Sequence, residues 1–303
     1  MRELKYAVPP EADGRALGDV LKRDLRLSRH RISSLKFSGG LRVDGLPAHT
    51  GIRLRAGQVV TVLLTDDAPS PAPWPLPLRT PYQDGDLLVV DKPAPLPAIH
   101  SAHQDARTLE NAVFSHLGCP EGFVYRPVSR LDKGTSGLMP VALNAHMHDR
   151  MQRLLHTPGY IREYLAVTEG APPMAAGVCD APIGMAEGVR RCVSPEGKPA
   201  VTHYRVLLKA NGRALVRLRL ETGRTHQIRV HLAHLGCPVA GDYLYGAPLP
   251  QLPGRFALHS AYLSFTHPLS GAIIRLESPL PEELRALLGQ ECGIFSINLG
   301  ILG

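Results

Sequence analysis

The chain has 303 residues, of which 44% are hydrophobic, and its formal net charge at pH 7 is +7. This length is sufficient for one large domain and one small module, each with its own core. The first residues, MRELKYAVPP, contain no apolar stretch of signal-peptide length, and no apolar run is long enough to span a bilayer. We therefore expect a cytoplasmic protein with no membrane partner. The five cysteines are widely spaced and form no Cys-x-x-Cys pair, which argues against a disulfide framework or a zinc knuckle.

The positive charge is concentrated near the N-terminus. Between Arg15 and Arg55 there are ten lysines and arginines and three acidic residues, and ten minus three accounts for the whole excess of seven. Such a segment is typical of a module that follows a phosphate backbone. A solvated charged face is the alternative, and composition alone does not separate the two.

Periodicity favours a folded module in this region. One short helix is predicted by apolar residues at helical spacing, namely Leu17, Val20, Leu21 and Leu25. Ser28 can cap a second helix, in which Ile32 and Leu35 face inward. The outer face of this second helix is then basic and consists of Arg29, His30, Arg31 and Lys36.

Short β-type runs follow the two helices. They lie around the turn signal Asp44-Gly45 and from Gln58 to Leu64. The segments SRHRI, LRVDG and IRLRAGQVVTV resemble the small RNA-binding domain shared with ribosomal small-subunit protein four. The resemblance implies that residues 1–65 form a small α/β RNA-binding module, with RNA contacts from Arg29, Arg31 and Lys36.

A proline-rich segment separates this module from the rest of the chain. Six prolines lie between Pro69 and Pro81, which favours extended polyproline geometry over helix or sheet interior. We interpret residues 66–82 as an extended linker. Residues 83–303 then form the second domain.

Strand-like runs outnumber helical runs in this second domain. The β-type segments are DLLVVD, GLMPVAL, YIREYLAV, THYRVLLK, RALVRLRL, FALHSAYLSF and AIIRLES. Helical patterns occur at Asn144–His156, Thr225–Gly236 and Pro281–Leu288, too few to alternate regularly with the strands. The pattern predicts an α+β domain with a mixed, mostly antiparallel sheet.

The segment SRLDKGTSGLM, from Ser129 to Met139, lies between two β-type runs. It is expected to be a strand-to-strand loop whose glycines permit unusual backbone geometry, so that Asp132 projects from a rigid sheet. Such a position suits a catalytic carboxylate, although an isolated Arg-Leu-Asp is more often a turn or cap. A serine-hydrolase role for Ser136 is disfavoured because GTSGL lacks the second glycine of a Gly-x-Ser-x-Gly elbow.

Three sequence segments, taken together in chain order, favour a catalytic role for Asp132 over a turn or cap. SRLDKGTSGLM, REYLAV (Arg162 to Val167) and TGRTHQIRVHLAHLGCPVAGDYLYG (Thr222 to Gly246) together resemble the RluA-like family of pseudouridine synthases. VVDKP and ALHSAYLSFTHPLSG agree with this resemblance. It implies the pseudouridine synthase fold and isomerisation of uridine within RNA, with no cofactor and no metal.

The resemblance also implies roles for three residues. Asp132 becomes the catalytic carboxylate, Tyr164 the aromatic residue beneath the target base, and Arg229 the partner of the carboxylate. An arginine beside the aspartate would hold it charged and aimed. On the expected helix, Arg229 lies at the edge of a buried stripe formed by Ile228, Leu232 and Leu235. Strand alternation places Tyr164 on one face with Tyr160, Arg162 and Ala166.

Further residues of the three strings are expected to contact RNA: Arg130, Arg162, Arg224 and His226. Arg130 could stack in the place of the extruded base or contact a phosphate, and the sequence favours neither. Ser129 and Arg162 replace residues that are commonly histidine and lysine in the family. The sequence therefore defines the substrate less well than the chemistry; ribosomal RNA is favoured and transfer RNA is possible. For the oligomeric state, we expect a monomer.

Three alternatives stay open. A zinc site could be imitated by His226, His231, His234 and Cys237, but His226 and His231 do not share a helix face. A catalytically inactive RNA-binding or ribosome-assembly protein of the same fold is disfavoured by the intact Asp, Tyr and Arg set. A glycosidase would need a second acid paired with Asp132 and would not explain the basic module.

Overall fold

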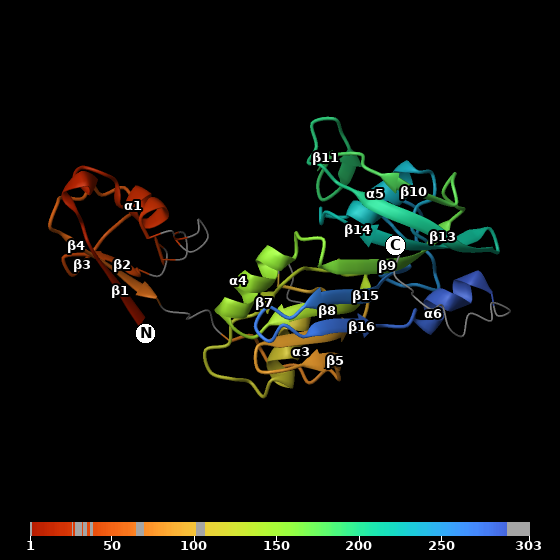
Figure 1. The fold of residues 1–303 in the computed structure, drawn as a ribbon, viewed down its shortest axis with the longest axis horizontal. Coiled ribbons are helices and arrows are strands. Elements are labelled where there is room, and N and C mark those ends of the chain that lie inside the picture. The colour runs from red at the N-terminus through yellow and green to blue at the C-terminus, as the bar shows by residue number, and fades with distance from the viewer. Residues whose placement is uncertain are drawn as a thin grey trace. The chain divides into compact units, whose positions relative to one another are not determined.

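The computed structural model describes residues 2–25, 27, 32, 35–36, 39–64, 70–100 and 107–289. It divides the chain into two compact units, Met1–Ser70 and Pro71–Gly303 (Figure 1). Each unit has its own apolar core. No helix in the described ranges is long and apolar enough to cross a membrane.

The first unit is a small sheet with short helices. Its sheet has the antiparallel order β1-β4-β2-β3, and its elements are β1 (Arg2–Ala7), η1 (Pro10–Ala12), α1 (Leu17–Arg23), β2 (Leu41–Val43), β3 (Leu46–Pro47) and β4 (Val59–Leu64). Asp44 and Gly45 have φ values of 49° and 80°, so they form the predicted tight turn between β2 and β3. Apolar residues of α1, β2 and β4 form the core. The first helix and the strand-like run from Gln58 are thus confirmed.

Only part of the second basic helix falls within the described residues. Ile32, Leu35 and Lys36 are helical, and Leu35 is buried in the core while Lys36 is exposed. This agrees with the predicted inward and outward faces. Arg29 and Arg31 lie outside the described residues.

The predicted linker, residues 66–82, is wrong at its C-terminal end. Arg79–Gln83 is strand β5, paired with β6 (Leu87–Lys92) at the edge of the large sheet. Before it, Trp74, Leu76 and Leu78 pack against the core of the second unit, and the Asn111 amide donates to the Ala72 carbonyl oxygen at 2.7 Å. The prolines therefore keep this segment extended while its apolar residues attach it to the domain.

The second unit contains a ten-stranded sheet with the order β10-β13-β14-β9-β15-β8-β6-β5, in which β7 also pairs with β8 and β16 with β15. All pairings are antiparallel except β8 with β15, which confirms the mixed, mostly antiparallel prediction. The remaining strands are β7 (Arg126–Pro127), β8 (Ser136–Ala142), β9 (Ile161–Glu169), β10 (Ala176–Cys179), β13 (Thr202–Ala210), β14 (Arg213–Leu220), β15 (Leu258–Thr266) and β16 (Ile273–Glu277). A separate hairpin consists of β11 (Ile183–Met185) and β12 (Arg191–Val193).

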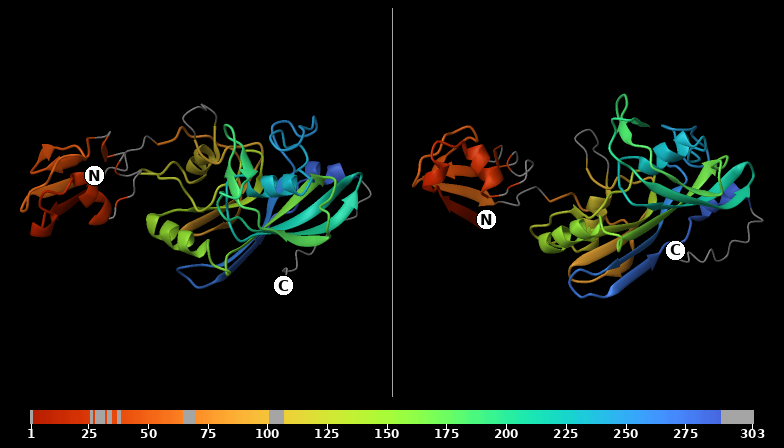
Figure 2. Two further views of the ribbon diagram at one scale, coloured as in Figure 1. Left: turned by 90° about the horizontal axis from the view of Figure 1, so that it is seen from above. Right: turned by 45° about the horizontal axis from the view of Figure 1, so that its top comes forward.

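In the described part of this unit, five helical segments accompany the sheet: α3 (Leu109–His116), α4 (Ala145–Leu154), α5 (Gln227–His234), α6 (Glu282–Arg285) and η2 (Ala286–Leu288). The three helices that the sequence predicts are α4, α5 and the α6–η2 pair. In Figures 1 and 2, α5 lies near β13 and β14, whereas α3 and α4 lie toward β5 to β8. The sequence does not predict α3, because its residues from Leu109 to Phe114 are nearly all buried and leave no amphipathic stripe.

Both faces of the central strands are buried. On β6, Leu88 and Val90 belong to the apolar cluster that includes α3 and α5 residues, whereas Leu87 and Val89 belong to the cluster that includes α4. This explains the unbroken run LLVV, since a strand covered on both sides has no polar face. Tyr160 packs on Phe265 in the α4 cluster, and Tyr164 lies in the other cluster. The predicted common face of Tyr160 and Tyr164 is therefore wrong, because β9 begins only at Ile161.

Candidate active site

One pocket of about 460 Å³ collects every predicted site residue of the second unit. These residues are Arg130, Asp132, Arg162, Tyr164, Arg224, His226 and Arg229. They come from the loop before β8, from β9, from the segment that leads into α5, and, for Arg229, from α5 itself. Residues separated by almost a hundred positions in the chain thus converge on one site.

The loop that carries Asp132 is tightly packed. The Thr135 N–H donates to the Asp132 carbonyl oxygen at 3.0 Å, which closes a turn. A Cβ atom on Gly134 would lie 2.6 Å from the Phe256 ring, and one on Gly137, where φ is +108°, would lie 2.3 Å from the Ser260 carbonyl oxygen. Both glycines are needed for close approach, and they fix the loop against the start of β15.

The Asp132 side chain reaches out of this turn to Arg229. Arg229 Nη1 donates to Asp132 Oδ2 at 3.0 Å, and the aspartate side chain is 30% exposed. The contacts of the carboxylate with Arg229 and with His226 both involve Oδ2. Asp132 lines the pocket, and within the described part of the chain its Oδ1 atom has no hydrogen-bond partner.

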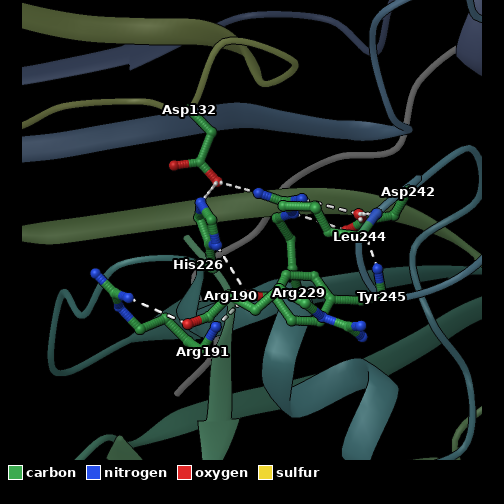
Figure 3. A network of polar contacts seen from close by, with 8 residues as sticks. All are labelled: Asp132, Arg190, Arg191, His226, Arg229, Asp242, Leu244 and Tyr245. Atoms are coloured by element: carbon green, nitrogen blue, oxygen red, sulfur yellow. Dashed lines mark hydrogen bonds and ion pairs between the residues drawn. The ribbon is translucent and has the colours of Figure 1, made fainter. Parts of the chain in front are cut away.

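Arg229 is 2% exposed and is therefore fully inside the protein, not at the edge of a stripe as the sequence predicts. Its Nε and Nη2 atoms donate to Asp242 Oδ2 and Oδ1 at 2.6 and 2.8 Å (Figure 3). The guanidinium carbon lies 4.2 Å from the Phe256 ring centroid and 4.9 Å from that of Tyr245. A buried guanidinium requires such partners, because an unpaired buried charge is strongly unfavourable.

Electrostatics keep Arg229 charged. Burial by itself lowers the pKa of Arg229, but the hydrogen bonds and charge of Asp242, together with Asp132, raise it above its ordinary value. Asp242 is completely buried and also accepts from the Leu244 N–H at 3.0 Å. One cation thus lies between two carboxylates, of which only Asp132 reaches the pocket.

Tyr164 lines the pocket and is 9% exposed. Burial raises the pKa of its hydroxyl, Arg162 lowers it, and Asp132 raises it further, so the net shift is upward and the phenol keeps its proton. Ser260, on the neighbouring strand β15, lowers this pKa. A protonated phenol with a fixed ring can both stack on a base and take part in proton transfer.

The other predicted RNA contacts differ in burial. Arg130 and Arg224 are exposed at the pocket, and Arg224 Nε donates to the Pro199 carbonyl oxygen at 2.9 Å. Arg162 is 7% exposed and lies beside Gly223. Lys36 belongs to the first compact unit. Arg130 and Arg224 are thus accessible from solvent, whereas Arg162 is buried, as Tyr164 is.

The structure argues against the alternative of a zinc site, because both ring nitrogens of His231 already have hydrogen-bond partners. His231 is buried, and its two ring nitrogens lie 2.8 Å from Thr202 Oγ1 and 2.9 Å from the Ala181 carbonyl oxygen. Among the residues that the structure describes, no group of three His, Cys, Asp or Glu side chains is arranged to hold a metal ion. His231 therefore has a structural role in α5.

Lys92 supports the site from outside the pocket, and the sequence analysis gives it no role although it lies in the quoted string VVDKP. It is completely buried, and its Nζ donates to the Leu96 carbonyl oxygen at 2.8 Å and lies 3.5 Å from that of Lys133. Burial lowers its pKa to about 7, although Asp132 raises it. Lys92 thus supports the segment beneath the Asp132 loop.

Asp242 and Tyr245 are also missed, although both lie inside the third quoted string. Asp242 could have been predicted from the place of Arg229 on an apolar helix, because a buried guanidinium there requires an acidic partner. A buried arginine needs more than one partly exposed carboxylate.

Comparison with known proteins gives consistent matches. A family model described as RNA pseudouridylate synthase matches residues 86–234. The chain is 38% identical to ribosomal large subunit pseudouridine synthase D of Xanthomonas campestris, over 94% of this chain and 92% of the relative. It is 36% identical to the protein of the same name from Pseudomonas aeruginosa, over 93% of each chain. Among solved structures, human RNA Pseudouridylate Synthase Domain Containing 4 is 28% identical with a TM-score of 0.56, and the match covers 69% of this chain and 91% of that one.

Buried Lys92 predicts a specific pH dependence of stability. Its pKa falls from 10.5 to about 7 on folding, so between these values the unfolded chain binds a proton that the folded chain does not. The free energy of unfolding should therefore rise with pH in this range, by at most about 1.4 kcal/mol per pH unit. Below pH 7 both states are protonated and the contribution is constant. Urea unfolding at intervals from pH 7.5 to 9 should show a steeper rise for the native protein than for Lys92→Met.

The control for this comparison is Lys209→Met, because Lys209 is exposed. It should keep the native slope. Equal slopes for the native protein and Lys92→Met would contradict the burial of a neutral lysine.

Proposed function

Because the chain belongs to the RNA pseudouridylate synthase family, we propose that it isomerises particular uridines of large-subunit ribosomal RNA, with Asp132 as the nucleophile. The chain is an enzyme that forms pseudouridine in RNA. The assignment of Asp132 rests mainly on the position of its carboxylate, which lines the pocket. Its Oδ2 accepts a hydrogen bond from Arg229, and its Oδ1 has no partner in the described residues.

In this reaction the bond between N1 of uracil and the ribose breaks, the base rotates, and its C5 bonds to the same ribose carbon. The C5 proton leaves and a proton is gained at N1, so the atoms balance without an oxidant, a reductant or water. Asp132 supplies the attacking oxygen, and Arg229 holds the carboxylate in place.

Tyr164 and Arg130 suit the handling of the base. A stacked uridine has to leave its helix, which costs a few kcal/mol. The buried ring of Tyr164 offers a stacking surface inside the pocket, and its phenol can move a proton. Exposed Arg130, two residues before Asp132, can occupy the space that the base leaves in the RNA. We assign it this stacking role.

The choice of ribosomal RNA rests on the relatives and on the first unit. Several relatives carry the name ribosomal large subunit pseudouridine synthase D, and the match extends over most of both units. The first unit holds a basic segment that resembles an RNA-binding domain. We therefore propose that this unit binds structured RNA while the second unit modifies it, and that the enzyme acts as a monomer.

Asp132→Asn tests the nucleophile. Asparagine keeps the size and can still accept from Arg229, which also retains Asp242, so folding and RNA binding should persist. Turnover should vanish because an amide does not attack the ribose or base. Release of tritium from the C5 position of labelled ribosomal RNA measures turnover, and a gel-shift titration measures binding.

The matched control is Asp149→Asn, which removes one exposed carboxylate on α4. It should turn over at the native rate. Appreciable tritium release by Asp132→Asn would rule out Asp132 as the nucleophile.

The first unit predicts a salt dependence of RNA affinity. A variant with glutamine at five exposed basic positions of this unit should bind more weakly; the positions are Lys22, Arg23, Lys36, Arg42 and Arg55. Each lost phosphate contact should reduce the slope of log affinity against log salt by about 0.7 to 0.9. Turnover of a short RNA hairpin at saturation should stay unchanged, because the catalytic pocket is intact. Superimposable slopes for the two proteins would mean that the basic segment is a solvated face.

A further inference from the structure

His226 lies closer to the nucleophile than a general RNA contact would require. Its Nε2 is 3.9 Å from Asp132 Oδ2, and its Nδ1 is 2.9 Å from the Tyr245 hydroxyl oxygen (Figure 3). The residue precedes α5 with φ of 59°, a left-handed conformation that is uncommon outside glycine. Such backbone strain often marks a functional position.

The hydrogen bonds around Tyr245 assign the tautomer of His226. The Tyr245 hydroxyl accepts from the Arg191 N–H at 2.9 Å. Its own proton then has one acceptor within the described residues, the Nδ1 atom of His226. A hydroxyl has a single proton, and Nδ1 is the one acceptor for it among the described residues, so we assign Nδ1 as the unprotonated nitrogen. The imidazole N–H is therefore on Nε2, facing Asp132.

The opposite tautomer is unfavourable on two counts. With the proton on Nδ1, the Tyr245 proton would have no acceptor among the described residues, and the Nε2 lone pair would face the Asp132 carboxylate. Burial lowers the pKa of His226, Asp132 raises it, and Arg229 lowers it, with a net downward shift. The ring is thus neutral at neutral pH and has one N–H to place.

Tyr245 is well fixed for this purpose. Its backbone N–H approaches Asp242 Oδ1 at 3.3 Å, so the carboxylate that binds Arg229 also holds the turn that carries Tyr245. Its ring covers the Arg229 guanidinium at 4.9 Å and meets the His226 ring edge-on at 5.7 Å. Arg191, which begins β12, binds the hydroxyl from the other side.

We propose that His226 is a second positioning residue for the nucleophile, with its Nε2–H fixed by Tyr245 and aimed at Asp132 Oδ2. Arg229 and His226 then hold the same oxygen, which orients Oδ1 toward the substrate. The separation of 3.9 Å has to shorten by about 1 Å for a direct hydrogen bond, as catalytic contacts do when substrate binds. The proposal rests on the proposed role of Asp132 as the nucleophile.

The test compares three variants of the full-length protein in single-turnover reactions with saturating ribosomal RNA. His226→Ala should lower the rate about tenfold to a hundredfold, with the RNA Kd unchanged, as expected for a residue that orients a reacting group. His226→Gln should recover part of the loss, because its amide N–H can occupy the position of Nε2–H. Tyr245→Phe should lower the rate less, since His226 stays but its tautomer is no longer fixed.

Nitrogen NMR of histidine-labelled protein gives a second readout. The signal of His226 should show an unprotonated Nδ1 in the native protein and a mixture of tautomers in Tyr245→Phe. A merely structural role would not change this signature together with the rate. The matched controls are Tyr243→Phe and His234→Gln, because both side chains are exposed nearby. Both should keep the native rate and the native His226 signal.

Three outcomes would overturn the proposal. A native rate in His226→Ala would show that Arg229 alone orients Asp132. A loss that appears in Kd and not in rate would make His226 an RNA contact. A protonated Nδ1 in the native protein would contradict the assigned tautomer. None of these results affects the role of Asp132, which fails separately if Asp132→Asn retains turnover.

Discussion

The site depends on one buried cation shared by two carboxylates. Arg229 is buried. Its guanidinium donates hydrogen bonds to Asp242 inside the protein and to Asp132 at the pocket. Losing one partner of a buried pair costs about 3–5 kcal/mol, so the geometry of this cluster is strongly enforced. Because Asp242 accepts hydrogen bonds from two atoms of the guanidinium, Nη1 remains available to hold Asp132. The same Asp242 carboxylate also holds the turn that carries Tyr245.

The sheet supplies the rigid frame for that cluster. β8 starts immediately after the Asp132 loop, and its only parallel pairing, with β15, occurs at Ser136 and Gly137. Gly137 permits the close contact with Ser260, whose strand also pairs with β9 at Tyr164. The Asp132 loop and the Tyr164 ring are therefore connected through a single strand, β15. Lys92 supports the same loop from the interior.

Much of the fold follows from sequence pattern, and the exceptions have physical causes. Strands such as β6 and β9 and the helices α4 and α5 are predictable from apolar runs and periodicity. α3 is missed because burial on nearly all sides removes its stripe, and the predicted linker is too long because proline is compatible with the edge strand β5.

For the site, motif resemblance identifies Asp132, Tyr164 and Arg229, and the structure places all three at one pocket. It does not reveal Asp242 or Lys92, since their importance arises from burial and long-range contacts that a linear pattern does not encode. The contacts of His226 are likewise not evident from the sequence. Its sequence position suggests RNA, whereas its ring nitrogens face Asp132 and Tyr245.

The most direct test of this account is the single-turnover rate of Arg229→Lys on saturating RNA. Lysine keeps the positive charge but lacks the planar fork that joins Asp242 to Asp132. A nucleophile displaced by about 1 Å can lose about a hundredfold in rate, so we predict a loss of that order with RNA affinity unchanged. Arg213→Lys, which alters a less buried pair with Glu169, should keep the native rate. A native rate in Arg229→Lys would contradict the claim that the shared guanidinium aims Asp132.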